Sequence, residues 1–97
     1  MHVESIPFSG QIKGLQEVFL PKGCWILDVQ HHENVLRLNV MTEDTMETAL
    51  HRFLVVQLPK GKRLTDNIEI NIDNLLLIDS CSTLYNQYFV FEILDED

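Results

Sequence analysis

The stretch Leu20-Pro-Lys-Gly-Cys-Trp-Ile-Leu-Asp-Val-Gln30 joins a turn signal to the strongest β-strand pattern in the chain. Proline and glycine favour a tight turn, because proline suits its second position (i+1) and glycine accepts a positive φ. From Trp25 to His31 the residues alternate, so that Trp25, Leu27 and Val29 share one face. This stretch predicts one strand that ends at the turn and a second strand that leaves it.

A second alternating run follows after a short polar connection and extends from Val35 to Val40. Two alternating runs around a short polar turn predict a β-hairpin. We expect the apolar face of the hairpin and the aromatic residues near the carboxyl end to form the core: Trp25, Leu27, Val29, Leu36, Leu38, Val40, Phe89 and Phe91.

Shorter strand signals lie on both sides of the hairpin. Upstream, His2 to Ile6 suits a short strand within an amino-terminal extension of residues 1–14, and Leu15 to Leu20 alternates. Downstream, Ile68 to Asp73 alternates strictly and Tyr88 to Leu94 is rich in β-formers. The apolar run Leu75-Leu-Leu-Ile78 predicts burial on both faces, and the polar residues 80–86 after it predict a loop.

The segment from Glu43 to Leu58 has two readings. Asp44 followed by Glu47 resembles a capping box, and apolar residues follow at helical spacing, which favours a short helix near 44–52. The β-formers that end in Val55-Val56 favour a strand from Thr48 to Gln57 instead. We expect the strand, with the short helix as the alternative.

Six to eight short strands at even spacing in 97 residues predict one all-β domain, mainly antiparallel, folded as a sandwich or barrel. The domain spans residues 1–97 and ends in an acidic tail, 95–97. Fifteen acidic against seven basic residues give a formal charge of −8, which argues against binding nucleic acid or an anionic membrane. The first residues lack the basic start and apolar stretch of a secretory signal, so we expect a cytoplasmic protein.

Little in the sequence indicates catalysis. Cys24 and Cys81 favour reduced thiols over a disulfide, and the adjacent His31 and His32 would point to opposite faces of a strand. We find no nucleophile elbow, metalloprotease helix or phosphate-binding loop. We therefore expect a protein that is not an enzyme and uses no metal or cofactor.

The segment Lys60-Gly-Lys-Arg63 places three of the seven basic residues within four positions of an acidic chain. Cations beside a glycine turn with exposed backbone N–H groups suit a phosphate or carboxylate. We take Lys60, Lys62 and Arg63, joined by Arg52 on the preceding strand, as the candidate ligand- or partner-binding residues. The alternative is a solvated loop whose charges relieve local repulsion.

The stretch from Leu20 to Gln30 also resembles the signature of a small uncharacterised domain found in bacteriophage genomes. The resemblance spans about residues 15–94, with the hairpin partner from Val35 to Met41 and Phe89-Val-Phe91 near the end. It departs from that pattern at Leu38-Asn39, where a tryptophan is usual, and at residues 57–61, where threonine-glycine is usual.

The resemblance implies a viral origin, and therefore the host cytoplasm, but no defined chemistry. By this analogy we expect a non-enzymatic accessory protein that inhibits a host defence protein by direct binding. The alternatives are a binder that sequesters a phosphate-bearing signal molecule and a structural or assembly component of a virion. We expect a homo-oligomer in each case, because a small open sandwich leaves edge strands.

Overall fold

The computed structural model describes residues 1–8, 14–33, 35–43, 47–63 and 74–94. They form seven strands, with these bounds: β1 His2–Pro7, β2 Gly14–Pro21, β3 Trp25–His32, β4 Val35–Thr42, β5 Thr48–Pro59, β6 Leu75–Ser82 and β7 Asn86–Ile93. Within the described ranges there is no helix, and thus no helix suited to crossing a membrane. The strand expected over 68–73 lies outside these ranges.

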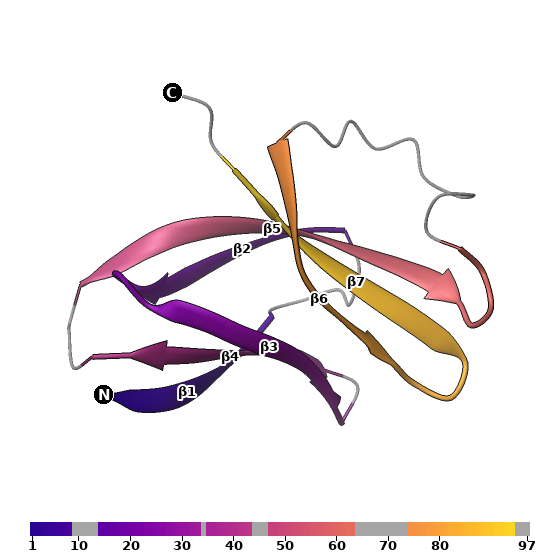
Figure 1. The fold of residues 1–97 in the computed structure, drawn as a ribbon, viewed down its shortest axis with the longest axis horizontal. Helices are drawn as coiled ribbons and strands as arrows, with labels where there is room; N and C mark the ends of the chain where they lie inside the picture. The colour runs from indigo at the N-terminus through magenta and orange to yellow at the C-terminus, as the bar shows by residue number, and fades with distance from the viewer. Residues whose placement is uncertain (9–13, 34, 44–46, 64–73, 95–97) are drawn as a thin grey trace.

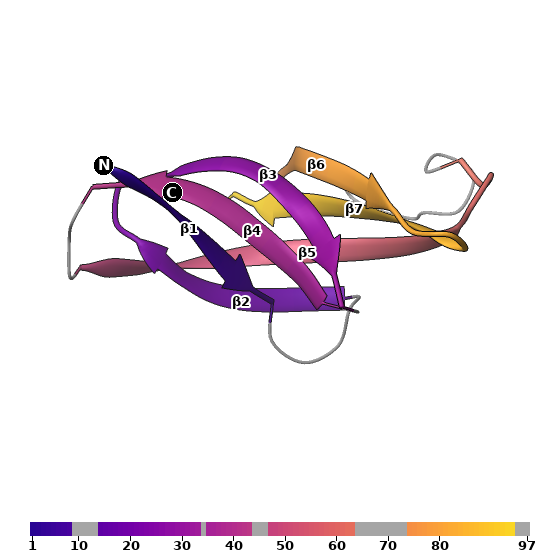
Figure 2. The same cartoon turned by 90° about the horizontal axis from the view of Figure 1, so that it is seen from below.

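The strands form two antiparallel sheets that stack as an open sandwich (Figures 1 and 2). One sheet has the order β1-β4-β3 and the other the order β2-β5-β7-β6. The shortest dimension of the molecule, 20 Å, suits two layers packed about 10 Å apart. The all-β sandwich expected from the sequence is thus confirmed, and β1 makes the amino-terminal residues part of a sheet.

The short helix considered for 44–52 is wrong over its described residues from Thr48 onward. That segment starts β5, which pairs with β2 on one side and, from Phe53, with β7 on the other. Over residues 48–52, the pairing with β2 takes up backbone groups that a helix would have bonded internally. Residues 44–46 lie outside the described ranges.

The core lies between the sheets and takes side chains from alternate positions of both. Leu38 and Val40 of β4 face Phe53 and Val90 across the sandwich, and all four are fully buried. The Phe53 ring meets Phe8 edge-on, with centroids 5.6 Å apart. This edge-to-face arrangement is favourable for aromatic rings and anchors the chain just after β1.

A β-bulge at Leu27 overturns part of the expected core. Trp25 lies opposite Met41 on β4, but Asp28 lies opposite Asn39, so the pairing shifts between Ile26 and Asp28. The extra residue reverses the side-chain alternation. Val29 therefore faces inward as expected, whereas Trp25 and Leu27 are exposed, and their predicted burial is wrong.

The two carboxyl-terminal aromatics depart from the expected core in a different way. Phe91 is buried and Phe89 is half-buried. Their register partners alternate with Val55, which faces the core, so both side chains point to the outer side of the four-stranded sheet.

A second bulge lies in β6, where the register shifts between Leu77 and Asp79. It turns Ile78 toward the core and leaves Leu76 and Leu77 half-exposed. The expected burial of this run on both faces is therefore wrong. The polar loop predicted over 80–86 is also shorter than expected, because β6 continues to Ser82 before the chain turns.

The two bulged strands, β3 and β6, lie next to each other along one side of the open sandwich. The backbone N–H of Val29 on β3 donates to Asp79 Oδ2 on β6 at 3.0 Å. Nearby, His31 of β3 stacks on Tyr88 of β7, with centroids 5.7 Å apart. The bond from Val29 to Asp79 satisfies a backbone donor on the edge strand β3, and this donor would otherwise be open to pairing with another chain.

The repeated Pro-Lys-Gly segments form matching turns after β2 and β5. The carbonyl of Pro21 accepts from the N–H of Cys24 at 3.2 Å, and the carbonyl of Pro59 accepts from Lys62 at 3.1 Å. Gly23 and the equivalent Gly61 have φ of 78° and 95°. Proline is thus the first residue of each turn rather than the second, and glycine takes the positive φ of the third.

Candidate protein-binding surfaces

A row of apolar side chains crosses the outside of the three-stranded sheet at one end. Val3 of β1 lies opposite Met41 of β4, and Met41 lies opposite Trp25 of β3. Trp25 is 53% exposed, and the bulged residue Leu27 beside it is also exposed. We call Val3, Trp25, Leu27 and Met41 the Trp25 patch.

Two of the four residues of the Trp25 patch, Trp25 and Met41, are of types that are enriched at protein interfaces. Tryptophan is the residue most enriched at the hot spots of such interfaces, and methionine is also favoured at interface cores. Burying the exposed half of one tryptophan against a partner contributes about 2–3 kcal/mol, from roughly 100 Å² at 25 cal/mol/Å². A few such contacts suffice to anchor a partner protein.

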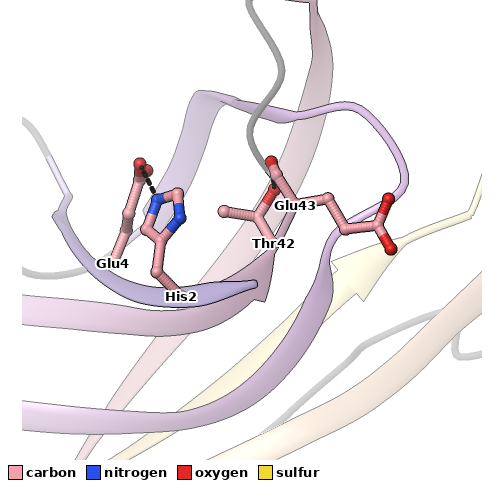
Figure 3. A network of polar contacts seen from close by, with 4 residues as sticks. All are labelled: His2, Glu4, Thr42 and Glu43. Atoms are coloured by element: carbon pink, nitrogen blue, oxygen red, sulfur yellow. Dashed lines mark hydrogen bonds and ion pairs between the residues drawn. The ribbon is translucent and has the colours of Figure 1, made fainter.

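Polar side chains of the same outer face border the Trp25 patch, where Asn39 Nδ2 donates to Asp28 Oδ1 at 2.6 Å. The contact of 2.9 Å between His2 Nε2 and Glu4 Oε1 lies on the other face of the sheet (Figure 3). His2 lies opposite the buried Thr42, one position beyond the row that contains Val3, so its side chain points to the opposite side. The patch itself therefore has an apolar centre and a polar neighbour on its own face, as is typical of interfaces.

The predicted basic segment lies at the opposite end of the molecule, where the turns after β5 and β6 sit side by side (Figures 1 and 2, right). The N–H of Lys60 donates to the carbonyl of Tyr85 at 2.9 Å, and Gln87 Nε2 donates to the carbonyl of Lys62 at 3.2 Å. These bonds place the cations beside Leu84 and Tyr85, which are 74% and 75% exposed. We call Lys60, Lys62, Arg63, Leu84 and Tyr85 the basic tip.

The geometry of the basic tip differs from that of a phosphate-binding turn. The N–H groups of Lys60 and Lys62 are already bonded to carbonyls, so the turn offers fewer backbone donors than the sequence suggested. Arg52 lies on β5 eight residues before Lys60, which follows the strand, so the two are about 26 Å apart at about 3.3 Å per residue. The structure therefore groups Lys60, Lys62 and Arg63 but places Arg52 elsewhere, opposite Glu17 on β2.

The other reactive side chains among the described residues are the two thiols and the histidines of the sandwich. Burial raises the pKa of both thiols, Cys24 and Cys81, and the charges of Glu92 and Glu4 raise that of Cys24 further. His51 Nδ1 lies 3.0 Å from Glu92 Oε2 inside one end of the sandwich. Among the residues described, no group of histidine, cysteine and acidic side chains is arranged to hold a metal.

Sequence reasoning missed the Trp25 patch and half of the basic tip. The alternation from Trp25 to Val29 looks continuous, so no pattern in the sequence reveals the bulge that turns Trp25 outward. Tyr85 joins the tip through a hydrogen bond to Lys60, 25 residues away, which no local pattern predicts. Within the basic tip, only the cations Lys60, Lys62 and Arg63 could be identified from the sequence.

Comparisons of the chain with protein-family models, with curated proteins and with solved structures found no match. The fold and its surfaces define a small antiparallel β-sandwich domain. The two surfaces above lie at opposite ends of it.

Proposed function

We propose that this chain is a non-enzymatic accessory protein that acts by binding another protein through the Trp25 patch. In the phage setting that the sequence resemblance implies, the partner is a host protein, and binding inhibits it. The observation that carries the proposal is the exposure of Trp25 in a row with Val3 and Met41. A bulge that turns a tryptophan into solvent costs core packing, and such irregularities concentrate at functional positions.

The test is affinity capture from a bacterial lysate with three immobilised variants. The first combines Trp25→Ala with Leu27→Ser and removes the centre of the patch. The matched control, Leu84→Ala with Tyr85→Ala, removes exposed apolar surface from the other end. We expect the control to retain the partner and the Trp25 variant to lose at least about tenfold in affinity, as for a hot-spot tryptophan worth about 2 kcal/mol.

Fluorescence with the purified partner checks the contact directly. Trp25 is the only tryptophan of the chain, so with a partner that lacks tryptophan the emission reports on this site alone. We expect a shift to shorter wavelength on binding, because the indole leaves water. Equal affinity of the native chain and the Trp25 variant would refute the role of the patch.

The basic tip supports a second candidate function, binding of an anionic ligand. Three cations on the turn after β5, in a chain with net charge −8, form a local positive site, and Tyr85 on the adjacent turn adds an aromatic side chain to it. The third variant changes Lys60, Lys62 and Arg63 to Ala. Loss of the partner in this variant alone would assign recognition to the tip, and a nucleotide in native mass spectra of freshly purified chain would favour a small phosphate-bearing ligand.

A further inference from the structure

An apolar row crosses the outer surface of the four-stranded sheet from one edge to the other. The strand register pairs Leu15 with Leu54, Leu54 with Phe91, and Phe91 with Leu77. These side chains point away from the core, because Val55 at the alternate position belongs to it. We call the surface formed by this row and its neighbours the outer apolar face.

Apolar residues continue on both sides of the row. Val56 pairs with Phe89 toward the end of the sheet that carries the basic tip, and Phe19 pairs with Leu50 toward the other end. Phe19, Leu50 and Leu77 are about half exposed or more. The whole face, with four strands about 4.8 Å apart and about eight residues long, spans roughly 500 Å² including its polar positions, and Phe91 within it is already buried.

The charges on this face are balanced. Among the described residues that the register places there, only Glu17 and Arg52 are charged, and they lie opposite each other. The chain as a whole carries −8. Two copies therefore repel through most of their surface but not through this face.

We infer that the outer apolar face is the interface of a homodimer, with the same face of a second copy packed against it. A two-fold axis makes such an interface self-complementary, and each copy contributes a face whose two charges, Glu17 and Arg52, already balance each other. Two footprints of roughly 500 Å² total about 1,000 Å² before side-chain relief is counted, which meets the size of a specific interface. A partner of opposite charge would be attracted by an acidic surface, so binding such a partner would not require the face to be neutral.

The dimer extends the proposed function without depending on it. The Trp25 patch lies on the outside of the other sheet, so the dimer leaves it open. Two patches then face away from each other on opposite sides of the assembly. Such a molecule engages two partner copies, or two sites of one oligomeric partner, with the gain in avidity that linked sites provide.

Sedimentation equilibrium of the full chain tests the inference, because monomer and dimer differ by the mass of one 11.3 kDa chain. We expect a dimer at micromolar concentration. Leu77→Glu puts a charge into the face at a position that is 52% exposed, and Leu84→Glu makes the same change at the basic tip. We expect the first to weaken the dimer about tenfold or more and the second to leave it intact, since only the first buries an unpaired charge.

A charge exchange adds a test that misfolding cannot imitate. Glu17→Arg gives a face with two positive charges, and Arg52→Glu gives a face with two negative charges. We expect each variant alone to be mainly monomeric and an equimolar mixture to form a heterodimer. Recovery on mixing shows that both variants are folded and that the faces meet.

Three results would overturn the inference. One is a monomer mass at several hundred micromolar. Another is a dimer that Leu77→Glu leaves intact but Trp25→Ala dissociates, which would assign the interface to the Trp25 patch. The last is a monomer in which the side chains of Phe19, Leu50 and Leu77 are protected from hydroxyl-radical labelling, which would mean that another part of the same chain covers the outer apolar face.

Discussion

At the scale of single residues, Trp25 shows how one inserted position changes the role of a side chain. The bulge at Leu27 sends it to the surface, whereas Phe53 occupies the centre of the core. Phe53 therefore contributes to the stability of the core, whereas Trp25 is free to serve the recognition that we propose.

We therefore predict that truncating Trp25 and truncating Phe53 lower the free energy of unfolding by different amounts. Trp25→Ala should lower the free energy of unfolding by less than about 1 kcal/mol, because the side chain is half in water. Phe53→Ala should lower it by about 3–5 kcal/mol, since it opens a cavity in the core. Urea unfolding at one protein concentration measures both, followed by circular dichroism because one variant lacks the tryptophan. A larger loss for Trp25 than for Phe53 would contradict the bulge.

The thiols give a second prediction at this scale. Burial raises the pKa of Cys24 and Cys81 above the ordinary value. The folded chain thus holds these protons more tightly than the unfolded chain, so the stability linked to them is full below about pH 8.5 and falls as the pH rises further. We expect slow reaction with thiol reagents at neutral pH and faster reaction after unfolding in urea. Equal rates in both states would refute it.

At the scale of elements, the two bulges account for most of what the sequence could not predict. Alternation located β2, β3, β4 and β7 and identified the hairpin, because half-buried strands require a period of two. An inserted residue leaves that pattern unbroken while it reverses the faces. The prediction that the run Leu75–Ile78 is buried on both faces was wrong for the same reason, since a bulge in β6 leaves part of this apolar run exposed.

The bond between the bulged strands predicts the effect of a substitution at Asp79. Its carboxylate accepts from the N–H of Val29 and also from the N–H of Ser80 at 2.8 Å. Asp79→Ala leaves the edge donor on β3 without this partner, and we expect a loss of about 1–3 kcal/mol in the free energy of unfolding. Ser82→Ala, on the same strand but exposed, is the control. Equal stability of both variants would show that the bond contributes nothing.

At the scale of the whole molecule, the charge distribution separates the surfaces by their response to salt. The chain carries −8, the basic tip is locally positive, and the outer apolar face is balanced. The outer apolar face could not be predicted from composition or from alternation, because it forms only when β2, β5, β7 and β6 lie side by side. The candidate cations, by contrast, were visible in the sequence.

These charges predict that salt strengthens self-association. Two copies of charge −8 repel over distances that salt screens beyond about 10 Å at 0.1 M. Raising sodium chloride from about 20 to about 300 mM should therefore tighten the dimer several-fold, as sedimentation equilibrium would measure. An anion held by Lys60, Lys62 and Arg63 should respond in the opposite sense, because the same screening weakens attraction. A dimer that dissociates as salt rises would mean that opposite charges, rather than the outer apolar face, hold the two copies together.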